Sequence, residues 1–451
     1  MGLFSMLVGS TGSLRVFQQA LEVAQNNVSN ASTPGFAKQR LLLAAQPFDP
    51  GQGLPGGLDA AGLQSFRNQF DEEAVRRRQE EFGLSDQQAA EISRLEPYFD
   101  VTGEAGIPEA LNGFFRSVSA WSVAPNDTMA RSAVIERAGY LAARVRDTAG
   151  GLERATVMAD RQIRTEVDTI NRLAQTVREL NTEARQSTRS AADPGLDARL
   201  NNVLEELAEH VDFTTVKQSD GSLIVLLGGQ TPLLVGDHLY EIHVESSNTA
   251  AILYDAQGHA ITSQVSRGRL GAMLEFRNTT LPSFMSDLDR LAAGLADSVN
   301  ALLAAGVDMN NQPGAPLFTY DAATSAAASL SVTSIRPEEL AAAVPAAPGG
   351  NGNVFALIEL ADSGQIDGAS FTEFYGALAR NVGRSLESAR EDLNTNQQLL
   401  LQARTLRQES SGVSLDEEAI LLIQFQRAYQ ATARLVMILN DLTETTINLL
   451  R

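Results

Sequence analysis

The run Ser411-Gly412-Val413-Ser414-Leu415-Asp416-Glu417-Glu418 opens the last helical stretch of this chain of 451 residues. Ser414 and Glu417 have the spacing of a helix capping box, and the acidic side chains after Ser414 suit the positive end of a helix dipole. No Gly or Pro occurs after Gly412. The sequence therefore predicts a long helix that begins near Ser414 and continues to Arg451.

Apolar residues recur every seven positions along this helix, and neighbouring aliphatic and aromatic residues widen the line into a stripe. So wide an apolar face is not stable alone in water and needs a partner. The first thirty residues carry a similar line, so we expect the two ends to pair as in a coiled coil. The alternative is two amphipathic helices that separately cover one core. The predicted packing residues are Leu7, Leu14, Phe17, Leu21, Val28, Leu421, Phe425, Ala428, Leu435, Leu442 and Leu449.

Between the ends, the chain alternates helical and irregular patterns. Residues 36–62 are rich in Pro and Gly and predict an extended connector, after which helical patterns resume at about Gln64. A very long helical region is expected from Asp127 to about Arg189, with a bend at Gly150-Gly151. Its second half carries a third line of apolar residues, which could be either a coiled-coil seam or a core stripe. That line consists of Ile163, Ile170, Val177 and Ala184.

Residues 211–266 change character, because short apolar runs alternate with turn signals such as Ser219-Asp220-Gly221 and Gly228-Gly229. Helical patterns return afterwards. The predicted fold is mainly α with an inserted β domain, as an elongated multi-domain rod with paired terminal helices, a long-helix bundle as shaft and a β-rich tip. The expected domains are residues 1–45 with 412–451 (terminal helices), 46–210 with 269–305 and 354–411 (shaft), and 211–268 with 306–353 (outer domain).

Composition narrows the classes of function. The formal net charge is −20 and Lys38 and Lys217 are the two lysines, so the chain lacks the basic face that nucleic acid requires. Cysteine is absent, which excludes disulfides and thiolate metal sites. The amino end does not have the pattern of a cleavable signal, and the apolar runs are too short to span a bilayer, so membrane insertion is not expected.

Residue types that carry chemistry are present but form no convincing constellation. Asp237, Glu241 and His243 would share one face of a strand, for which a solvated strand face is the better interpretation than a metal trio. The stretch from Asp308 resembles the start of a calcium loop, but Pro313 and Thr319 stand where that loop needs Gly and Glu. We therefore expect no catalytic, metal or cofactor site, and we expect that the protein is not an enzyme.

Two motifs resemble those of the flagellar axial proteins, the family of rod, hook and hook-associated proteins. The amino-terminal signature is carried by Asn27, Asn30 and Thr33-Pro34-Gly35. The run Gly412–Glu418 closely resembles the corresponding run of the hook-associated protein 1 family, whereas hook and rod proteins usually lack it. Three positions depart from the family pattern. Leu303 stands where the family often has His, and Asn68 and Leu200 stand where the family pattern has Asp. The signature residues are Asn27, Asn30, Thr33, Pro34, Gly35, Gly412, Val413, Ser414, Leu415, Asp416, Glu417 and Glu418.

The resemblance implies a structural subunit at the junction between hook and filament, needed for filament assembly at the hook tip. It implies secretion through the flagellar type III export apparatus, an extracellular place in the flagellum, and self-assembly into a junction zone. Hook protein, hook-associated protein 3 and an export chaperone on residues 411–451 would be partners. The alternatives are a hook or distal-rod protein of the same family, or a secreted coiled-coil scaffold or adhesin.

Overall fold

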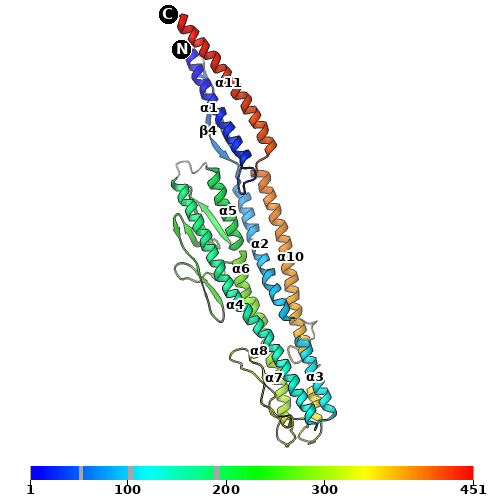
Figure 1. Ribbon diagram of the computed structural model, residues 1–451. Helices are drawn as coiled ribbons and strands as arrows, with labels where there is room; N and C mark the ends of the chain where they lie inside the picture. The colour runs from blue at the N-terminus through cyan, green and yellow to red at the C-terminus, as the bar shows by residue number, and fades with distance from the viewer. Residues whose placement is uncertain (1, 50–53, 100–105, 187–192, 219, 450–451) are drawn as a thin grey trace. The chain divides into compact units, whose positions relative to one another are not determined.

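The computed structural model describes residues 2–49, 54–99, 106–186, 193–218 and 220–449 (Figure 1). The chain is mainly helical with small antiparallel sheets, which confirms the predicted fold class. It divides into two compact units, one of residues 1–83, 169–242 and 396–451 and the other of residues 84–168 and 243–395. Three long helices supply residues to both units: α2 (Gln69–Leu95), α4 (Thr128–Gln186) and α10 (Phe371–Ser411).

In the first unit, the two ends of the chain pair. Helix α1 (Gly2–Ser29) packs along α11 (Leu415–Leu449), as Figure 1 shows in blue and red. The predicted start of α11 is confirmed, because the Ser414 Oγ accepts the Glu417 N–H at 3.4 Å. Residues 450 and 451, which the prediction included in the helix, lie outside the described residues.

A β-hairpin stands where the sequence predicted an extended connector. Strands β1 (Gln39–Ala45) and β4 (Leu58–Ser65) pair antiparallel, and β2 (Phe48–Asp49) pairs with β3 (Leu54–Pro55). The prediction missed this pairing because the run from Leu41 to Ala45 does not alternate apolar with polar residues. The expected helix start at Gln64 was also wrong, since Gln64 pairs with Arg40 in the hairpin and α2 begins at Gln69.

The rest of this unit packs α4 and α5 (Pro194–His210) with a four-stranded antiparallel sheet in the order β5-β6-β7-β8. The Asn181 side chain of α4 donates to the Leu223 carbonyl at 2.8 Å and accepts the Leu223 N–H at 3.0 Å, which fixes helix against sheet. The strands are β5 (Phe213–Lys217), β6 (Leu223–Leu227), β7 (Thr231–Val235) and β8 (His238–Leu239).

The third apolar line of the sequence lies on α4, which continues through Gly150-Gly151 without a break in the helix. All four residues of the line are buried. Leu180 and Ala184 pack with Leu196 of α5, so the line serves there as a core stripe, one of the two readings that the sequence left open.

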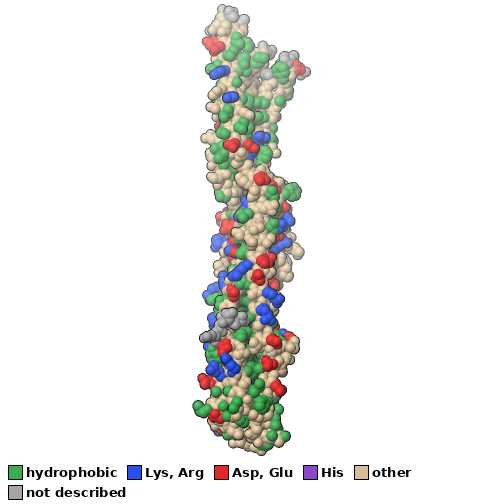
Figure 2. All heavy atoms as spheres, turned by 90° about the vertical axis from the view of Figure 1, so that its right-hand side faces the viewer, with side chains coloured by type: hydrophobic (Ala, Val, Ile, Leu, Met, Phe, Trp, Pro, Cys, Tyr) green, Lys and Arg blue, Asp and Glu red, His purple; other side chains and the backbone are tan. Residues whose placement is uncertain are grey.

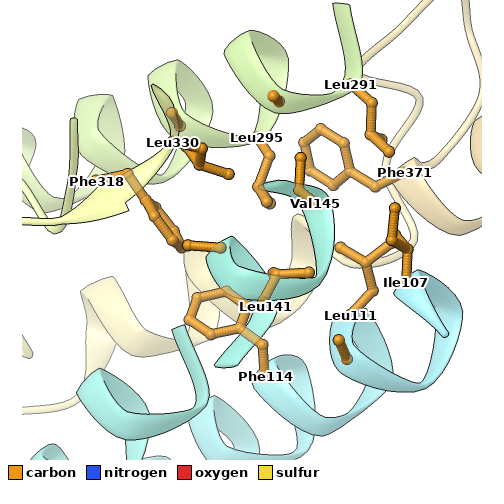
Figure 3. Close-up of a cluster of buried hydrophobic side chains, with 14 of the residues drawn as sticks. Ile107, Leu111, Phe114, Leu141, Val145, Leu291, Leu295, Phe318, Leu330 and Phe371 are labelled. Atoms are coloured by element: carbon orange, nitrogen blue, oxygen red, sulfur yellow. The ribbon is translucent and has the colours of Figure 1, made fainter. Parts of the chain in front are cut away.

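The second unit has its own apolar core, in which aromatic and aliphatic side chains of several helices and loops meet (Figure 3). Phe114 packs edge-on against Phe318 with ring centroids 5.9 Å apart, and Phe371 stacks on Phe115. The helical elements are α3 (Ile107–Val123), α6 (Gly268–Glu275), a π-helical turn (Phe276–Thr280), α7 (Leu281–Ala305), α8 (Ala326–Ser329) and α9 (Gly352–Glu359). Short 3-10 turns cover Glu96–Phe99, Thr262–Gln264 and Pro337–Glu339.

Two small antiparallel pairs complete the second unit. They are β9 (His243–Ser246) with β10 (Ala251–Tyr254), and β11 (Phe318–Thr319) with β12 (Ser331–Val332). The strand segments expected between residues 211 and 266 are thus present, but β5 to β8 belong to the first unit and β9 and β10 to the second. The division into three domains that the sequence suggested stays a prediction.

Candidate assembly site at the paired termini

The buried line of α1 is offset from the seven-residue line expected for it. Helix α1 is covered by both α11 and the β1–β4 hairpin, so its buried line faces both elements and not α11 alone. The residues on this line are mostly small. Of the predicted packing residues, Leu7, Leu14, Phe17 and Leu21 are half-buried and Val28 is exposed. The buried positions are Gly9, Ser13, Val16, Ala20, Ala24 and Asn27.

On α11 the predicted packing line is covered at one end only. Leu421, Phe425 and Ala428 are half-buried, whereas Leu435 and Leu442 are exposed. Leu439 is the apolar residue that α11 buries most deeply, at 7% exposure. The side chain of Leu449 lies outside the described residues. The pairing therefore protects part of the α11 stripe and leaves a second part open.

The uncovered part forms an apolar face along α11. Successive residues of an α-helix are rotated by about 100°, so the members of this face fall within an arc of about 120° on one side of the helix, which they share with the exposed Arg427, Arg434 and Asp441. Figure 2 shows hydrophobic side chains (green) on the surface of the paired termini, with a few charged ones between them. We call the following residues the open face of α11: Ile420, Ile423, Leu435, Ile438 and Leu442, all exposed.

The amino-terminal signature holds α1 to the hairpin. Asn27 is fully buried, and its side-chain amide donates to the Gln39 carbonyl at 2.7 Å and accepts the Gln39 N–H at 3.1 Å. Nearer the start of α1, the Ser13 Oγ accepts the Leu58 N–H at 3.0 Å. A buried amide that satisfies both backbone groups of one strand residue fixes the strand's register, which gives Asn27 its structural role.

The remainder of this signature shapes the turn after α1. Thr33 Oγ1 donates to the Asn30 side chain at 3.2 Å, which closes the turn locally. Gly35 has a φ of +69°, a conformation that favours glycine. The Pro34 carbonyl accepts the Asn202 side-chain N–H at 2.9 Å, and the Gly35 carbonyl accepts a guanidinium N–H of Arg67 at 2.6 Å, so the turn is bound to α5 and to the segment before α2.

The carboxy-terminal run meets the amino-terminal segment at its first residues. The buried Ser411 accepts the Lys38 N–H on its carbonyl at 2.8 Å, and its hydroxyl donates to the Phe66 carbonyl at 3.0 Å. Lys38 Nζ lies 2.7 Å from Glu417 Oε2, and this contact lowers the pKa of Glu417 through hydrogen bonding and charge. The carboxy-terminal motif is thus bound to Lys38, three residues after the amino-terminal signature.

Beside this contact lies a polar cleft of about 580 Å³, lined by the turn after α1 together with α2, α5 and the end of α10. Arg407 pairs with Glu205 at 2.6 Å and with Glu72 at 3.1 Å, and Arg404 pairs with Glu205 at 2.8 Å. Burial acts to raise the pKa of Glu205, but Arg407 and Arg404 outweigh burial and lower it. The cleft is therefore held together by a network of carboxylates and guanidinium groups.

Sequence reasoning missed most of this network. Glu72, Glu205 and Arg404 lie on helices whose charged residues look like ordinary solvated faces, and the pairs Arg404–Glu205 and Arg407–Glu72 join residues 199 and 335 positions apart. In the sequence, Arg67 is notable only because Asn68 follows it where the family often has Asp. In the structure its guanidinium pairs with Glu72 and Asp197. Charge pattern along one helix does not identify a partner on another, so a single sequence offers little signal for such pairs.

Within the described ranges, no group of three or more His, Cys, Asp or Glu side chains is placed to hold a metal ion. Among the same residues, no helix is long and apolar enough to cross a membrane.

Family models and the sequences of known proteins match this chain. A family model described as flagellar hook-associated protein FlgK helical domain matches residues 92–318, and one described as flagellar basal body rod FlgEFG protein C-terminal matches residues 406–449. Flagellar hook-associated protein 1 of Bacillus subtilis (strain 168) is 25% identical over 488 residues, covering 97% of this chain and 96% of the relative. Its namesake in Escherichia coli (strain K12) is 21% identical over 546 residues, covering 99% and 100%.

A solved structure supports the fold. The flagellar hook junction protein FlgK from Burkholderia pseudomallei matches with a TM-score of 0.67 at 16% identity, covering 75% of this chain and 100% of that chain. Since the first family model spans half of the sequence, the chain belongs to the family of flagellar hook-associated protein FlgK.

Proposed function

We propose that this chain is a structural subunit of the bacterial flagellum at the junction of hook and filament, needed for filament assembly at the hook tip. Its relatives are named flagellar hook-associated protein 1, and the solved structure of similar fold is that of a flagellar hook junction protein. The observation in this chain that carries the proposal is the open face of α11, a group of exposed Leu and Ile side chains that the described residues leave uncovered.

Burial of that face favours association. Full burial of a Leu or Ile side chain contributes about 1.5–3 kcal/mol relative to exposure, so each half-exposed residue of the face would contribute roughly 1 kcal/mol when a neighbour covers it. The net charge of −20 opposes association of free copies and keeps them apart. Association then depends on a surrounding that aligns the apolar faces, as the tip of a growing flagellum does.

The partners follow from this role. We infer contacts with hook protein on one side and hook-associated protein 3 on the other, and with further copies in the junction zone. Before secretion through the flagellar type III apparatus, the open face of α11 would bind an export chaperone. A role in assembly needs no cofactor and no catalysis. Before assembly, the terminal segments would be less ordered than in the flagellum, because neighbours offset the cost of ordering them.

Electron microscopy of a strain that lacks the gene tests the proposal. We expect hooks without filaments, with flagellin lost to the medium, and filaments restored when the chain is supplied from a plasmid. Filaments of normal length in the deletion strain would refute the proposal. Loss of the hooks themselves would favour the alternative, a hook or distal-rod protein of the same family.

A further inference from the structure

An apolar groove lies at the paired termini, where α1, the turn between β3 and β4, and α11 meet. It has a volume of about 370 Å³. Of its lining residues, Gly9, Ser13 and Gly56 are buried, whereas Leu435 and Met6 are each about half exposed. None of its lining residues is charged. The residues are Met6, Gly9, Ser10, Ser13, Phe17, Gly56, Gly57, Leu58, Thr432, Leu435 and Leu439.

The opposite side of α1 carries two protruding apolar side chains. Phe4 is 68% exposed and Val8 is 57% exposed. Successive residues of an α-helix are rotated by about 100°, so Phe4 lies about 200° from Met6, and Val8 lies about 200° from Ser10. Met6 and Ser10 line the groove, and Phe4 and Val8 therefore project away from it.

We propose that the groove of one copy receives Phe4 and Val8 of a second copy. This inference rests on the proposed function, because it describes how neighbouring subunits would meet. A contact between two different surfaces of the same molecule is heterologous, and repetition of such a contact generates a ring or a helical array rather than a closed pair. The groove extends along α1 from Met6 to Phe17, whereas Phe4 and Val8 lie about five to six residues before its middle. At 1.5 Å per residue, a neighbour whose α1 runs parallel is therefore displaced along the helix axis by roughly 8 Å.

The lack of charge on both surfaces favours a second copy as the occupant. The whole chain carries −20, so two copies repel each other over most of their surface. The stretch from Gly2 to Leu14 contains no charged residue, and the groove contains none either. The two surfaces can therefore meet without bringing like charges together, and an uncharged groove would not compensate a charged ligand for lost hydration.

Because the chain has no cysteine, single introduced cysteines report on this contact. Val8→Cys and Leu435→Cys are expressed together in the deletion strain, and isolated hooks with their attached structures are oxidised. We expect a disulfide-linked dimer that is absent when either variant is expressed alone. Val8→Cys with Met309→Cys is the control pair, since Met309 is exposed but belongs to the other compact unit, and it should give no dimer.

A companion variant, Ser10→Phe, fills the groove from within. It should abolish the mixed dimer while the purified chain keeps the helical content of the parent. A dimer formed by Val8→Cys alone would indicate a symmetric contact, and a cross-link of Val8→Cys to a different protein would assign its surface to another partner. Either result would overturn the inference, as would filament growth without any mixed dimer. Failure of the parent chain to restore filaments would instead refute the proposed function.

Discussion

Lys38 and Glu417 stand 379 positions apart in the chain, and their side chains form an ion pair of 2.7 Å. Lys38 follows the amino-terminal signature, and Glu417 belongs to the run that opens α11. The pair changes the local prediction for that run. Ser414 accepts the N–H of Glu417 as a capping residue does, but the Glu417 carboxylate is bound to Lys38 instead of completing the capping box.

The substitution Glu417→Gln should make the stability of the paired termini less dependent on pH. The hydrogen bond and charge of Lys38 lower the pKa of Glu417 in the folded chain. The stabilisation is therefore present above the unfolded pKa, about 4.3, and is lost as the pH falls through the folded pKa. Denaturation of parent and variant at pH 7 and at acid pH measures this, and a stability difference that is equal at both pH values would contradict the assignment.

Truncation of Leu439 should weaken the pairing of α1 with α11, whereas truncation of Leu442 should not. Leu439 is 7% exposed and Leu442 is 48% exposed on the same helix. Leu439→Ala is expected to lower the free energy of opening of the pair by about 2–3 kcal/mol, and Leu442→Ala by less than about 1 kcal/mol. Amide hydrogen exchange in α1 and α11 of the free chain reports both values. Equal effects of the two variants would mean that the helices do not pack as described.

Gly35→Ala should destabilise the chain more than Gly221→Ala. Both glycines have positive φ, so an alanine costs roughly 1–2 kcal/mol in backbone strain at either position. At Gly35 an added Cβ would also lie 2.1 Å from the Asn202 Oδ1, whereas nothing lies within 4 Å at Gly221. Displacement of Asn202 breaks its bond to Pro34, which adds about 1 kcal/mol. Chemical denaturation distinguishes the two variants, and equal losses would show that the contact with Asn202 is unimportant.

Glu205→Gln should loosen the network of the polar cleft. Glu205 is mostly buried and accepts from both Arg404 and Arg407, and hydrogen bonds of this charged kind contribute about 1.5–3 kcal/mol each. We expect a loss of roughly 2 kcal/mol at pH 7, because Arg407 retains Glu72. The neighbouring Glu206, whose side chain is exposed, serves as the control: Glu206→Gln should change stability by less than about 0.5 kcal/mol. Parity between the two variants would argue against a structural network.

The elements with strong periodic patterns were predictable from the sequence. The helix after Ser414, its pairing with the amino end and the strands between residues 211 and 254 were all found at or near their expected places. Each depends on a local signal, namely a cap, a seven-residue repeat or alternation bounded by glycine turns. These signals act within a few residues and survive in a single sequence.

The sequence could not predict which element covers a given helix face or which residues pair between helices. On α1 the buried positions shift to Gly9, Ser13 and Ala20 because the hairpin covers part of the helix, and the sequence does not reveal the hairpin. Likewise, the partners of Arg407 lie on α2 and α5, and no pattern along α10 identifies them. Helix periodicity indicates that a face will be buried, but the element that buries it follows from the tertiary structure.

The central claim, that the open face of α11 is an assembly surface, is tested most directly by complementation with charged variants. Ile438→Glu places a carboxylate on that face, and Val157→Glu places one at an equally exposed apolar position of α4 in the other compact unit. Each variant is supplied to the deletion strain, and hooks with filaments are counted by electron microscopy. We predict bare hooks for Ile438→Glu and filaments for Val157→Glu. Filaments at the parental frequency with Ile438→Glu would contradict the claim.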